Sequence, residues 1–199
     1  MTLGAGGRHQ VEKVTEWGKG AGPFTLKPAK FNFNIPHGLA LAEDKNQLCV
    51  ADRENGRVQC FDLNGKFVSS LQPAEFGSRI FSAAYTKAKG EGGPGLAWSD
   101  RCLTGGLIHA VSGPEFSLNP WTRKPTGYVV SLDSGELVGS WNVPGGLQNP
   151  HDVAVSEDGN TVYVCELNPF KVWKLTNGGS GVPVGEEPGV LLRLLGLLG

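Results

Sequence analysis

Two Pro-His pairs are the residues of this sequence best suited to metal chemistry: Pro36-His37 and Pro150-His151. Neutral imidazole is the commonest protein ligand for zinc, and a catalytic zinc site takes three protein ligands and leaves one position open. Asp152, directly after the second histidine, is a candidate ligand for a hard cation such as Ca²⁺. The structural alternative is that each histidine caps a turn where a strand begins, and that Asp152 caps the strand.

A second candidate feature is the segment between Cys49 and Cys60. If Glu54-Asn55 forms the turn of a hairpin, the two cysteines are equidistant from that turn and face each other across the strand pair. Directly opposed residues approach the Cβ separation that a disulfide needs, so we favour a Cys49–Cys60 disulfide over two buried thiols. Cys102 and Cys165 have no evident partner.

Arg53 lies at the turn of this hairpin, between Asp52 and Glu54. A guanidinium group presents a planar fork that matches a carboxylate, so Arg53 is a candidate for binding an anionic substrate group. The structural alternative is a solvated surface arginine. The remaining histidines have a different context, because His109 falls within a strand pattern without a preceding proline, which favours a packed histidine, and His9 lies in a Gly-rich terminus.

The composition gives no reason to expect binding to nucleic acid. The chain has 199 residues, a formal net charge of −1 and a pI of about 6.4, and its Lys and Arg residues are scattered. Its 30 glycines, without long apolar helical runs, suit a β protein with many tight turns. No stretch reaches the roughly 18 apolar residues of a membrane-spanning helix, and residues 1–13 lack the apolar core of a secretory signal.

An internal repeat relates the two Pro-His pairs. The segments that begin at these pairs align without a gap at a constant offset of 114 residues, so that Val50, for example, falls on Val164. A third, degenerate copy lies between them, where residues 106–113 take the place of the strand around Val50 and residues 127–141 resemble residues 56–71. The units are short segments rich in Val, Leu, Phe and Tyr, separated by Gly-containing turns, which predicts antiparallel strands.

Repeat units of this kind predict a β-propeller, in which each unit is a blade of three or four antiparallel strands. Neighbouring blades bury each other's faces, and propellers usually close at about four to eight blades. The sequence supplies about three blades, so we expect part of a ring. Because the innermost strands line the central channel, equivalent histidines on different blades are expected to converge on one axis.

Composition divides the chain into three regions. Residues 1–10 are predicted to be a flexible N-terminus, residues 11–176 the partial propeller, and residues 177–199 a tail rich first in Gly, Pro and Glu and then in Leu. The Gly-rich segment 88–105 interrupts the repeat as an insertion. We expect the insertion and the tail to be poorly ordered, and residues 11–17 to form the closing strand of a preceding unit.

The run CVADRENGRVQCF at residues 49–61 resembles the peptidylamidoglycolate lyase domain of peptidylglycine α-amidating monooxygenase. The runs IPHGLAL at residues 35–41 and PHDVAVSEDG at residues 150–159 are similar to the same family. The resemblance covers about residues 11–176, outside the insertion, and corresponds to the C-terminal half of that domain. The CVADRENGR run is far more specific than a generic NHL repeat.

The resemblance implies an all-β fold, a six-bladed propeller of NHL-like repeats, of which this chain has about three blades. It implies a zinc-dependent carbon–nitrogen lyase that cleaves peptidyl-α-hydroxyglycine to an amidated peptide and glyoxylate. Family zinc is held by three histidines from Pro-His units, and two of them map onto His37 and His151. Three further family features map onto this sequence: a structural calcium ligand at Asp152, a substrate-contacting arginine at Arg53, and a disulfide at Cys49–Cys60.

The sequence also departs from the family pattern. The third zinc histidine, a tyrosine and a second active-site arginine belong to N-terminal blades that this chain lacks. We therefore expect an incomplete site, with the missing N-terminal half of the propeller or the monooxygenase domain as partners. The family and the disulfide imply the secretory pathway, in the granule lumen or outside the cell. The alternative function is a non-catalytic NHL-repeat module for protein interaction, which predicts reduced cysteines and no zinc dependence.

Overall fold

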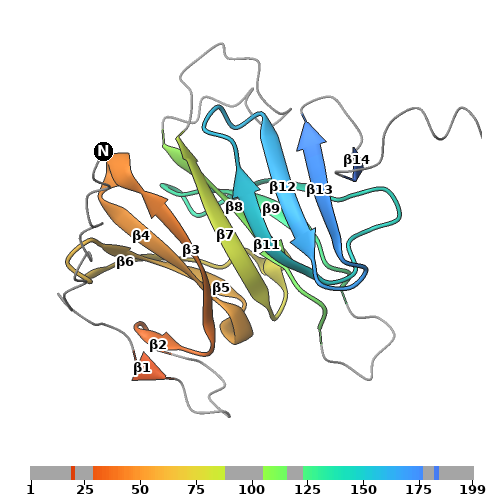
Figure 1. Ribbon diagram of the computed structural model, residues 1–199. Coiled ribbons are helices and arrows are strands. Elements are labelled where there is room, and N and C mark those ends of the chain that lie inside the picture. Colours follow the sequence, from red (N-terminus) through yellow and green to blue (C-terminus); the bar gives the residue numbers. More distant parts are fainter. Residues whose placement is uncertain (1–18, 21–28, 88–104, 116–122, 177–181, 184–199) are drawn as a thin grey trace, which may run out of the picture.

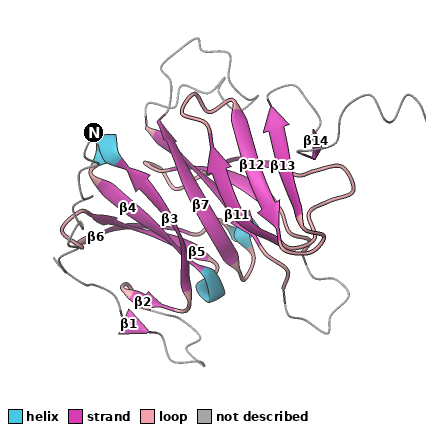
Figure 2. Cartoon of the chain, viewed as in Figure 1, coloured by secondary structure: helices cyan, strands magenta, loops and turns pink. Residues whose placement is uncertain are grey.

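The computed structural model describes residues 19–20, 29–87, 105–115, 123–176 and 182–183 (Figure 1). Strands dominate this part of the chain, and its helices are three short 3₁₀ segments, η1 (Glu43–Lys45), η2 (Arg53–Asn55) and η3 (Ala74–Phe76) (Figure 2). None of the described helices is long and apolar enough to span a bilayer. The described residues are thus all-β, as the sequence predicts.

The strands form three four-stranded sheets, in each of which the strands follow one another in chain order. The first sheet contains β3 (Pro36–Ala42), β4 (Gln47–Asp52), β5 (Arg57–Asp62) and β6 (Phe67–Leu71). The second contains β7 (Ile80–Lys87), β8 (Gly106–Ser112), β9 (Gly127–Ser131) and β10 (Leu137–Trp141). The third contains β11 (Pro150–Val155), β12 (Thr161–Glu166), β13 (Lys171–Thr176) and β14 (Val182–Pro183). Two short strands, β1 (Lys19–Gly20) and β2 (Asn32–Phe33), pair separately.

Each four-stranded sheet is an antiparallel meander, which is the architecture of a propeller blade. The first strands of the three sheets, β3, β7 and β11, lie side by side (Figure 1). The three described sheets do not close into a ring, and three is fewer than the usual four to eight blades. The prediction of about three propeller blades is confirmed.

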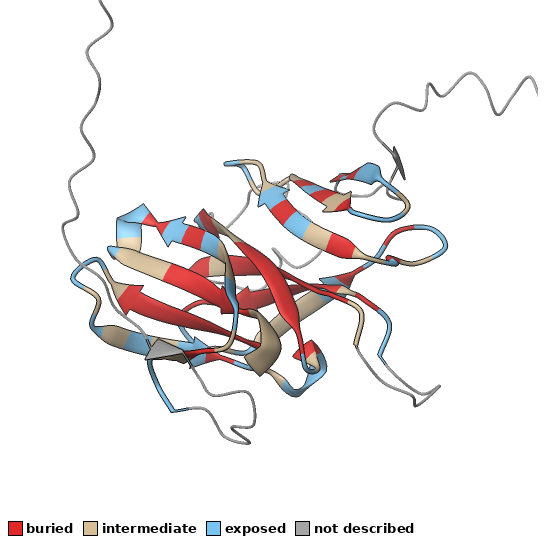
Figure 3. Ribbon diagram, turned by 60° about the horizontal axis from the view of Figure 1, so that its bottom comes forward, coloured by how far each residue is buried: buried red, intermediate tan, exposed pale blue. Residues whose placement is uncertain are grey.

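Apolar side chains fill the spaces between consecutive blades. The core between the first and second blades includes Cys49, Cys60, Leu71, Ile80 and Tyr128. The core between the second and third blades includes Val111, Val129, Trp141, Val164 and Trp173. Buried residues fill most of β8 and β9, whereas β3, β6 and β13 also carry exposed residues (Figure 3). Burial of each blade against the next is what fixes the innermost strands relative to one another.

Several predicted segments lie outside the described residues. They are the N-terminus 1–10, the closing strand 11–17, the insertion 88–105 apart from its last residue, and the tail 177–199 apart from β14. The degenerate repeat copy is confirmed, because β8 and β9 take the same places in the second blade as β4 and β5 take in the first.

Candidate functional site

Each blade presents one side chain at the same point of its innermost strand: His37 on β3, Phe81 on β7 and His151 on β11. At this point the ladder to the second strand shifts register in all three blades, between Pro36 and Leu39, Ile80 and Ser82, and Pro150 and Asp152. Such a bulge turns a side chain away from the direction that the regular alternation of side chains along a strand would give it. The same local irregularity therefore brings the three side chains to one place.

The two predicted metal-binding histidines lie next to each other, although 114 positions separate them in the sequence. The ring centroids of His37 and His151 are 4.6 Å apart, and the ring planes meet at 72°. Two imidazoles on one tetrahedral zinc, with Zn–N distances of about 2.0–2.1 Å, have centroids roughly 5 Å apart. The separation of the two rings is compatible with a shared zinc ion.

Both imidazoles are available as ligands. Within the described part of the chain, neither ring makes a hydrogen bond to another residue. Burial lowers the pKa of His151, and the charges of His37 and Arg53 lower it further against the opposing charge of Asp152. A lowered pKa keeps more of this imidazole in the neutral form, which is the form that binds a metal.

Two donors do not complete a zinc site. Among the residues that the structure describes, no group of three or more His, Cys, Asp and Glu side chains is placed to hold a metal ion. The remaining ligands of a zinc ion between His37 and His151 would have to be water, substrate or another segment of protein. Zinc binding therefore stays a prediction.

Phe81 occupies the position at which the other two blades have histidine. Its ring centroid lies 5.5 Å from that of His37 and 5.5 Å from that of His151. The central guanidinium carbons of Arg53 and Arg79 lie 4.9 and 5.2 Å from the same centroid. One buried aromatic ring thus contacts both imidazoles and both arginines.

Arg53 begins η2 and is held in place by Glu54. Its Nε and Nη2 atoms both donate to Glu54 Oε1 at 2.8 Å, and Arg79 donates to the same oxygen from Nε at 3.0 Å. Burial raises the pKa of Glu54, but the hydrogen bonds and charges of Arg79 and Arg53 outweigh burial and hold this pKa below its usual value. Glu54 therefore stays ionised and fixes both arginines beside Phe81.

The position of Arg53 is compatible with the predicted contact to a substrate carboxylate. Its side chain is 20% exposed. Within the described residues, its Nη1 group makes no hydrogen bond. A free N–H group next to the histidine pair can donate to an anionic ligand. The contact of Arg53 with a substrate carboxylate stays a prediction.

Asp152 lies on β11, directly after His151, and joins the third blade to the second. Its Oδ1 atom accepts hydrogen bonds from Ser82 Oγ on β7 and from the backbone N–H of Val153. On the other side of Ser82, β3 approaches so closely that a Cβ on Gly38 would lie 2.6 Å from Ser82 Oγ. No cluster of three or more metal-binding side chains includes Asp152 among the described residues, so its calcium role stays a prediction.

The predicted disulfide between Cys49 and Cys60 is confirmed. The two residues are directly paired between β4 and β5, and both are fully buried. The predicted two-residue turn is wrong, because η2 and Gly56, which has a φ of +58°, make a four-residue connection. The cysteine pairing is unaffected, since the longer connection is centred on the same point. Cys165 is free, and Cys102 lies outside the described residues.

His109 is a packed histidine, as its sequence context favours. It is 1% exposed, and its Nε2 atom lies 3.0 Å from the hydroxyl of Thr86. Burial lowers the pKa of His109 to about 4, so the ring is neutral at pH 7. His9 lies outside the described residues.

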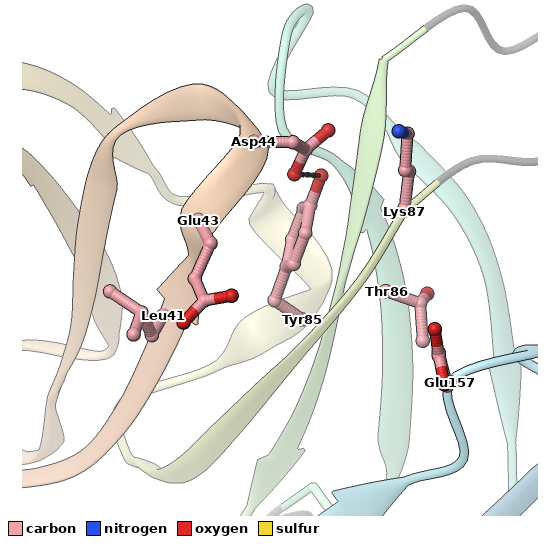
Figure 4. A pocket seen from close by; sticks show the side chains of 7 residues that line it. All are labelled: Leu41, Glu43, Asp44, Tyr85, Thr86, Lys87 and Glu157. Atoms are coloured by element: carbon pink, nitrogen blue, oxygen red, sulfur yellow. Dashed lines mark hydrogen bonds between the residues drawn. The ribbon is translucent and has the colours of Figure 1, made fainter.

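A pocket of about 350 Å³ lies toward the opposite ends of β3 and β7, away from the histidine pair. Its walls are Leu41, Glu43, Asp44, Tyr85, Thr86, Lys87 and Glu157 (Figure 4). The Tyr85 hydroxyl donates to Asp44 Oδ1 at 2.8 Å (Figure 4). Burial and this carboxylate raise the pKa of Tyr85, so the phenol stays protonated.

Comparisons with known proteins match both the repeat and the histidine region. The NHL repeat family matches residues 33–61, which include His37 and the disulfide hairpin. Peptidyl-alpha-hydroxyglycine alpha-amidating lyase 1 of Drosophila melanogaster is 40% identical over 167 residues, 81% of this chain and 28% of that protein. The probable peptidyl-alpha-hydroxyglycine alpha-amidating lyase pgal-1 of Caenorhabditis elegans is 69% identical over 147 residues, 72% of this chain and 35% of that protein.

The chain is a homologue of the amidating lyases. Peptidyl-glycine alpha-amidating monooxygenase of Mus musculus is also 36% identical over 82% of this chain, but over 14% of its own length. The chain thus spans about a third or less of the curated amidating lyases and monooxygenases it matches. The NHL match covers one unit of the blade repeat, and similarity over most of the chain supports the predicted resemblance.

Phe81, Arg79 and Glu54 are site residues that the sequence pattern did not identify. Phe81 follows the repeat rule that places His37 and His151, but the insertion 88–105 separates β7 from β8 and hides the alignment. An alignment that allows a gap at this point places Phe81 at the histidine position.

Proposed function

We propose that this chain carries part of the active site of a peptidyl-α-hydroxyglycine α-amidating lyase. The observation that carries the proposal is the 4.6 Å approach of the His37 and His151 rings, with Arg53 beside them. These residues come from the repeated Pro-His units and from the specific hairpin run. The names of the relatives supply the substrate class, peptides that end in α-hydroxyglycine.

In this proposal His37 and His151 hold a zinc ion that supplies Lewis acidity toward the α-hydroxyl group of the substrate. Burial and neighbouring charge keep His151 neutral. Arg53 uses its free N–H group to bind the carboxylate of the hydroxyglycine and so orients the carbon–nitrogen bond. Phe81 excludes water from one side of both imidazoles.

The reaction balances without an oxidant. The α-hydroxyl group loses its proton and its C–O bond becomes the aldehyde C=O of glyoxylate. The bond between the α-carbon and the amide nitrogen breaks, and its electron pair stays on nitrogen, which takes up a proton. The products are a primary amide and glyoxylate.

The incomplete set of zinc ligands indicates the partners, and the disulfide indicates the compartment. We propose that further blades, or a joined monooxygenase domain, supply the third zinc ligand, and that Asp152 contributes to a structural calcium site. A buried disulfide persists in an oxidising compartment, so we place the protein in the secretory pathway, in the granule lumen or outside the cell.

The test is glyoxylate release from a synthetic peptidyl-α-hydroxyglycine, measured with added zinc and with a chelator. We expect zinc-dependent release above the spontaneous rate, and loss of this excess in His151→Ala. Arg53→Lys should reduce kcat/KM by about 10-fold or more, because a charged hydrogen bond to the substrate is lost. A matched control is Lys45→Ala, a partly exposed residue whose partner is Asp133. Release above the spontaneous rate that is equal in the unsubstituted chain and in His151→Ala would reject the proposal.

A further inference from the structure

Both blades that present a histidine also contain a buried carboxylate at the end of their second strand. Asp52 ends β4 and is paired with Pro36, and Glu166 ends β12 and is paired with Pro150. Asp52 is 0% exposed and Glu166 is 4% exposed. Buried carboxylates need strong hydrogen-bond partners, so the groups that they bind are informative.

Glu166 binds the backbone that leads into the second Pro-His pair. Its Oε1 atom accepts hydrogen bonds from the backbone N–H groups of Gln148 at 2.6 Å and Asn149 at 3.0 Å. Its Oε2 atom accepts from the indole N–H of Trp173 at 2.7 Å. The carboxylate therefore fixes the two residues directly before Pro150 against the third strand of the blade.

Asp52 does the same in the first blade. Its Oδ1 atom accepts from the backbone N–H of Asn34 at 2.7 Å, two positions before the proline of the first Pro-His pair. Its Oδ2 atom accepts from Arg57 Nε at 2.8 Å, Asn55 Nδ2 at 2.8 Å and Gln59 Nε2 at 3.1 Å. Each carboxylate thus uses one oxygen for the approach segment and the other for its own blade.

The middle blade, which presents Phe81 instead of histidine, has no carboxylate at this position. Ser112 stands there, paired with Ile80, and its hydroxyl group exchanges hydrogen bonds with the backbone of Thr126 at 3.2 and 3.0 Å. Thr126 precedes β9, so within the described residues this side chain does not bind the segment before β7. At the end of the second strand, a buried carboxylate is therefore present in the two blades that present histidine, and a serine stands in the one that does not.

All three blades share one backbone hydrogen bond at this point, so the side chains at the end of their second strands can be compared directly. The residue after each second strand donates its N–H to the residue before each first strand: Arg53 to Ile35 at 3.2 Å, Gly113 to Arg79 at 3.2 Å, and Leu167 to Asn149 at 3.1 Å. This backbone hydrogen bond therefore joins the ends of the first two strands in all three blades. What is confined to the histidine blades is the buried carboxylate at the end of the second strand. In the middle blade the backbone N–H of Ser78, two positions before Ile80, donates to Glu115 Oε1 at 3.0 Å, from the loop after β8.

We propose that Asp52 and Glu166 are positioning residues that set the approach of His37 and His151 toward each other. The proposal rests on the proposed function only in its zinc readout. A charge-assisted hydrogen bond to a backbone N–H is shorter and stronger than a neutral one. Fixing the residues just before each bulge limits how far the imidazole can turn, and outer partners of this kind preserve ligand geometry.

The experiment compares three variants of the full chain: Glu166→Gln, Asp52→Asn and the matched control Ser112→Ala. Ring proximity is read without metal, as the nuclear Overhauser effect between the imidazole protons of His37 and His151 in chain labelled at histidine. Zinc affinity is read by calorimetry, and thermal stability is recorded for each variant. Trp173→Phe serves as a milder substitute if Glu166→Gln does not fold, since it removes one hydrogen bond and keeps the carboxylate.

We expect Glu166→Gln and Asp52→Asn to weaken the ring-to-ring signal and to raise the zinc Kd by about 10-fold. Ser112→Ala should lower thermal stability and leave both readings unchanged. If the signal and the zinc Kd stay at the values of the unsubstituted chain while stability falls, the carboxylates are structural and the inference is wrong. If the unsubstituted chain binds no zinc but the ring signal falls as expected, positioning stands and the proposed zinc site is rejected.

Discussion

At the scale of single residues, the site depends on one position per blade and on the groups around it. His37 and His151 could be predicted from the sequence because a proline marks each and the offset is constant. Phe81 could not, since its type gives no sign of metal chemistry and the insertion obscures its place in the repeat. The ion pair of Glu54 with Arg79 was also hidden, because it joins the first blade to the residue before the second.

Phe81 is expected to contribute to stability as well as to the site. The ring is 6% exposed and contacts four side chains, so Phe81→Ala should lower the free energy of unfolding by about 3 kcal/mol or more. Urea denaturation measures the change. Phe170, which is 84% exposed, provides the control, and Phe170→Ala should change stability by less than about 0.5 kcal/mol. Equal losses in the two variants would show that Phe81 is not packed as described.

His109 is expected to make stability depend on pH. Its pKa is lowered from 6.5 to about 4 by burial, so the unfolded chain takes up a proton first as the pH falls. The stabilisation is complete above the unfolded pKa and is lost as the pH falls from 6.5 toward 4, by about 3 kcal/mol in all. Urea unfolding at pH 7, 6 and 5 should show this slope, and His109→Gln should flatten it. An unchanged slope in the variant would assign the pH dependence to other groups.

At the scale of elements, the β4–β5 hairpin is the part that the sequence predicted best. Cys49 and Cys60 face each other because they are equidistant from the centre of the connection between the strands. The pairing was therefore predicted correctly although the predicted turn length was wrong, since strand register depends on that centre. The first strand of the middle blade was harder to predict. Its partner strand, β8, follows only after the insertion 88–105. The alternation of apolar and polar residues along β7 therefore did not show with which strand β7 pairs.

The disulfide is expected to stabilise this hairpin. Cys49→Ala with Cys60→Ala should lower the free energy of unfolding by about 2–3 kcal/mol, because the short closed loop restricts the unfolded chain. The measurement is the urea midpoint under non-reducing conditions. Cys165→Ala is the control and should shift stability by less than about 1 kcal/mol, since this thiol is unpaired and half-buried. If the double variant is as stable as the control, the disulfide carries no part of the stability.

At the scale of the whole molecule, the repeat predicted the architecture and the packing of blades explains the site. Each inter-blade core orients one innermost strand against the next, so residues far apart in the sequence meet at β3, β7 and β11. Convergence of the histidines was predictable from propeller geometry. Their 4.6 Å separation was not, because it depends on the bulges and on the packing of Phe81 against both rings.

The most direct test of the central claim, that His37 and His151 bind one metal ion together, is a zinc titration of the purified chain. We expect one zinc per chain, and we expect His37→Ala and His151→Ala each to weaken binding by at least about 10-fold. X-ray absorption of the zinc-loaded chain should then show two imidazole ligands per ion. No zinc binding, or binding that neither variant weakens, would contradict the claim and leave the pair without a metal role.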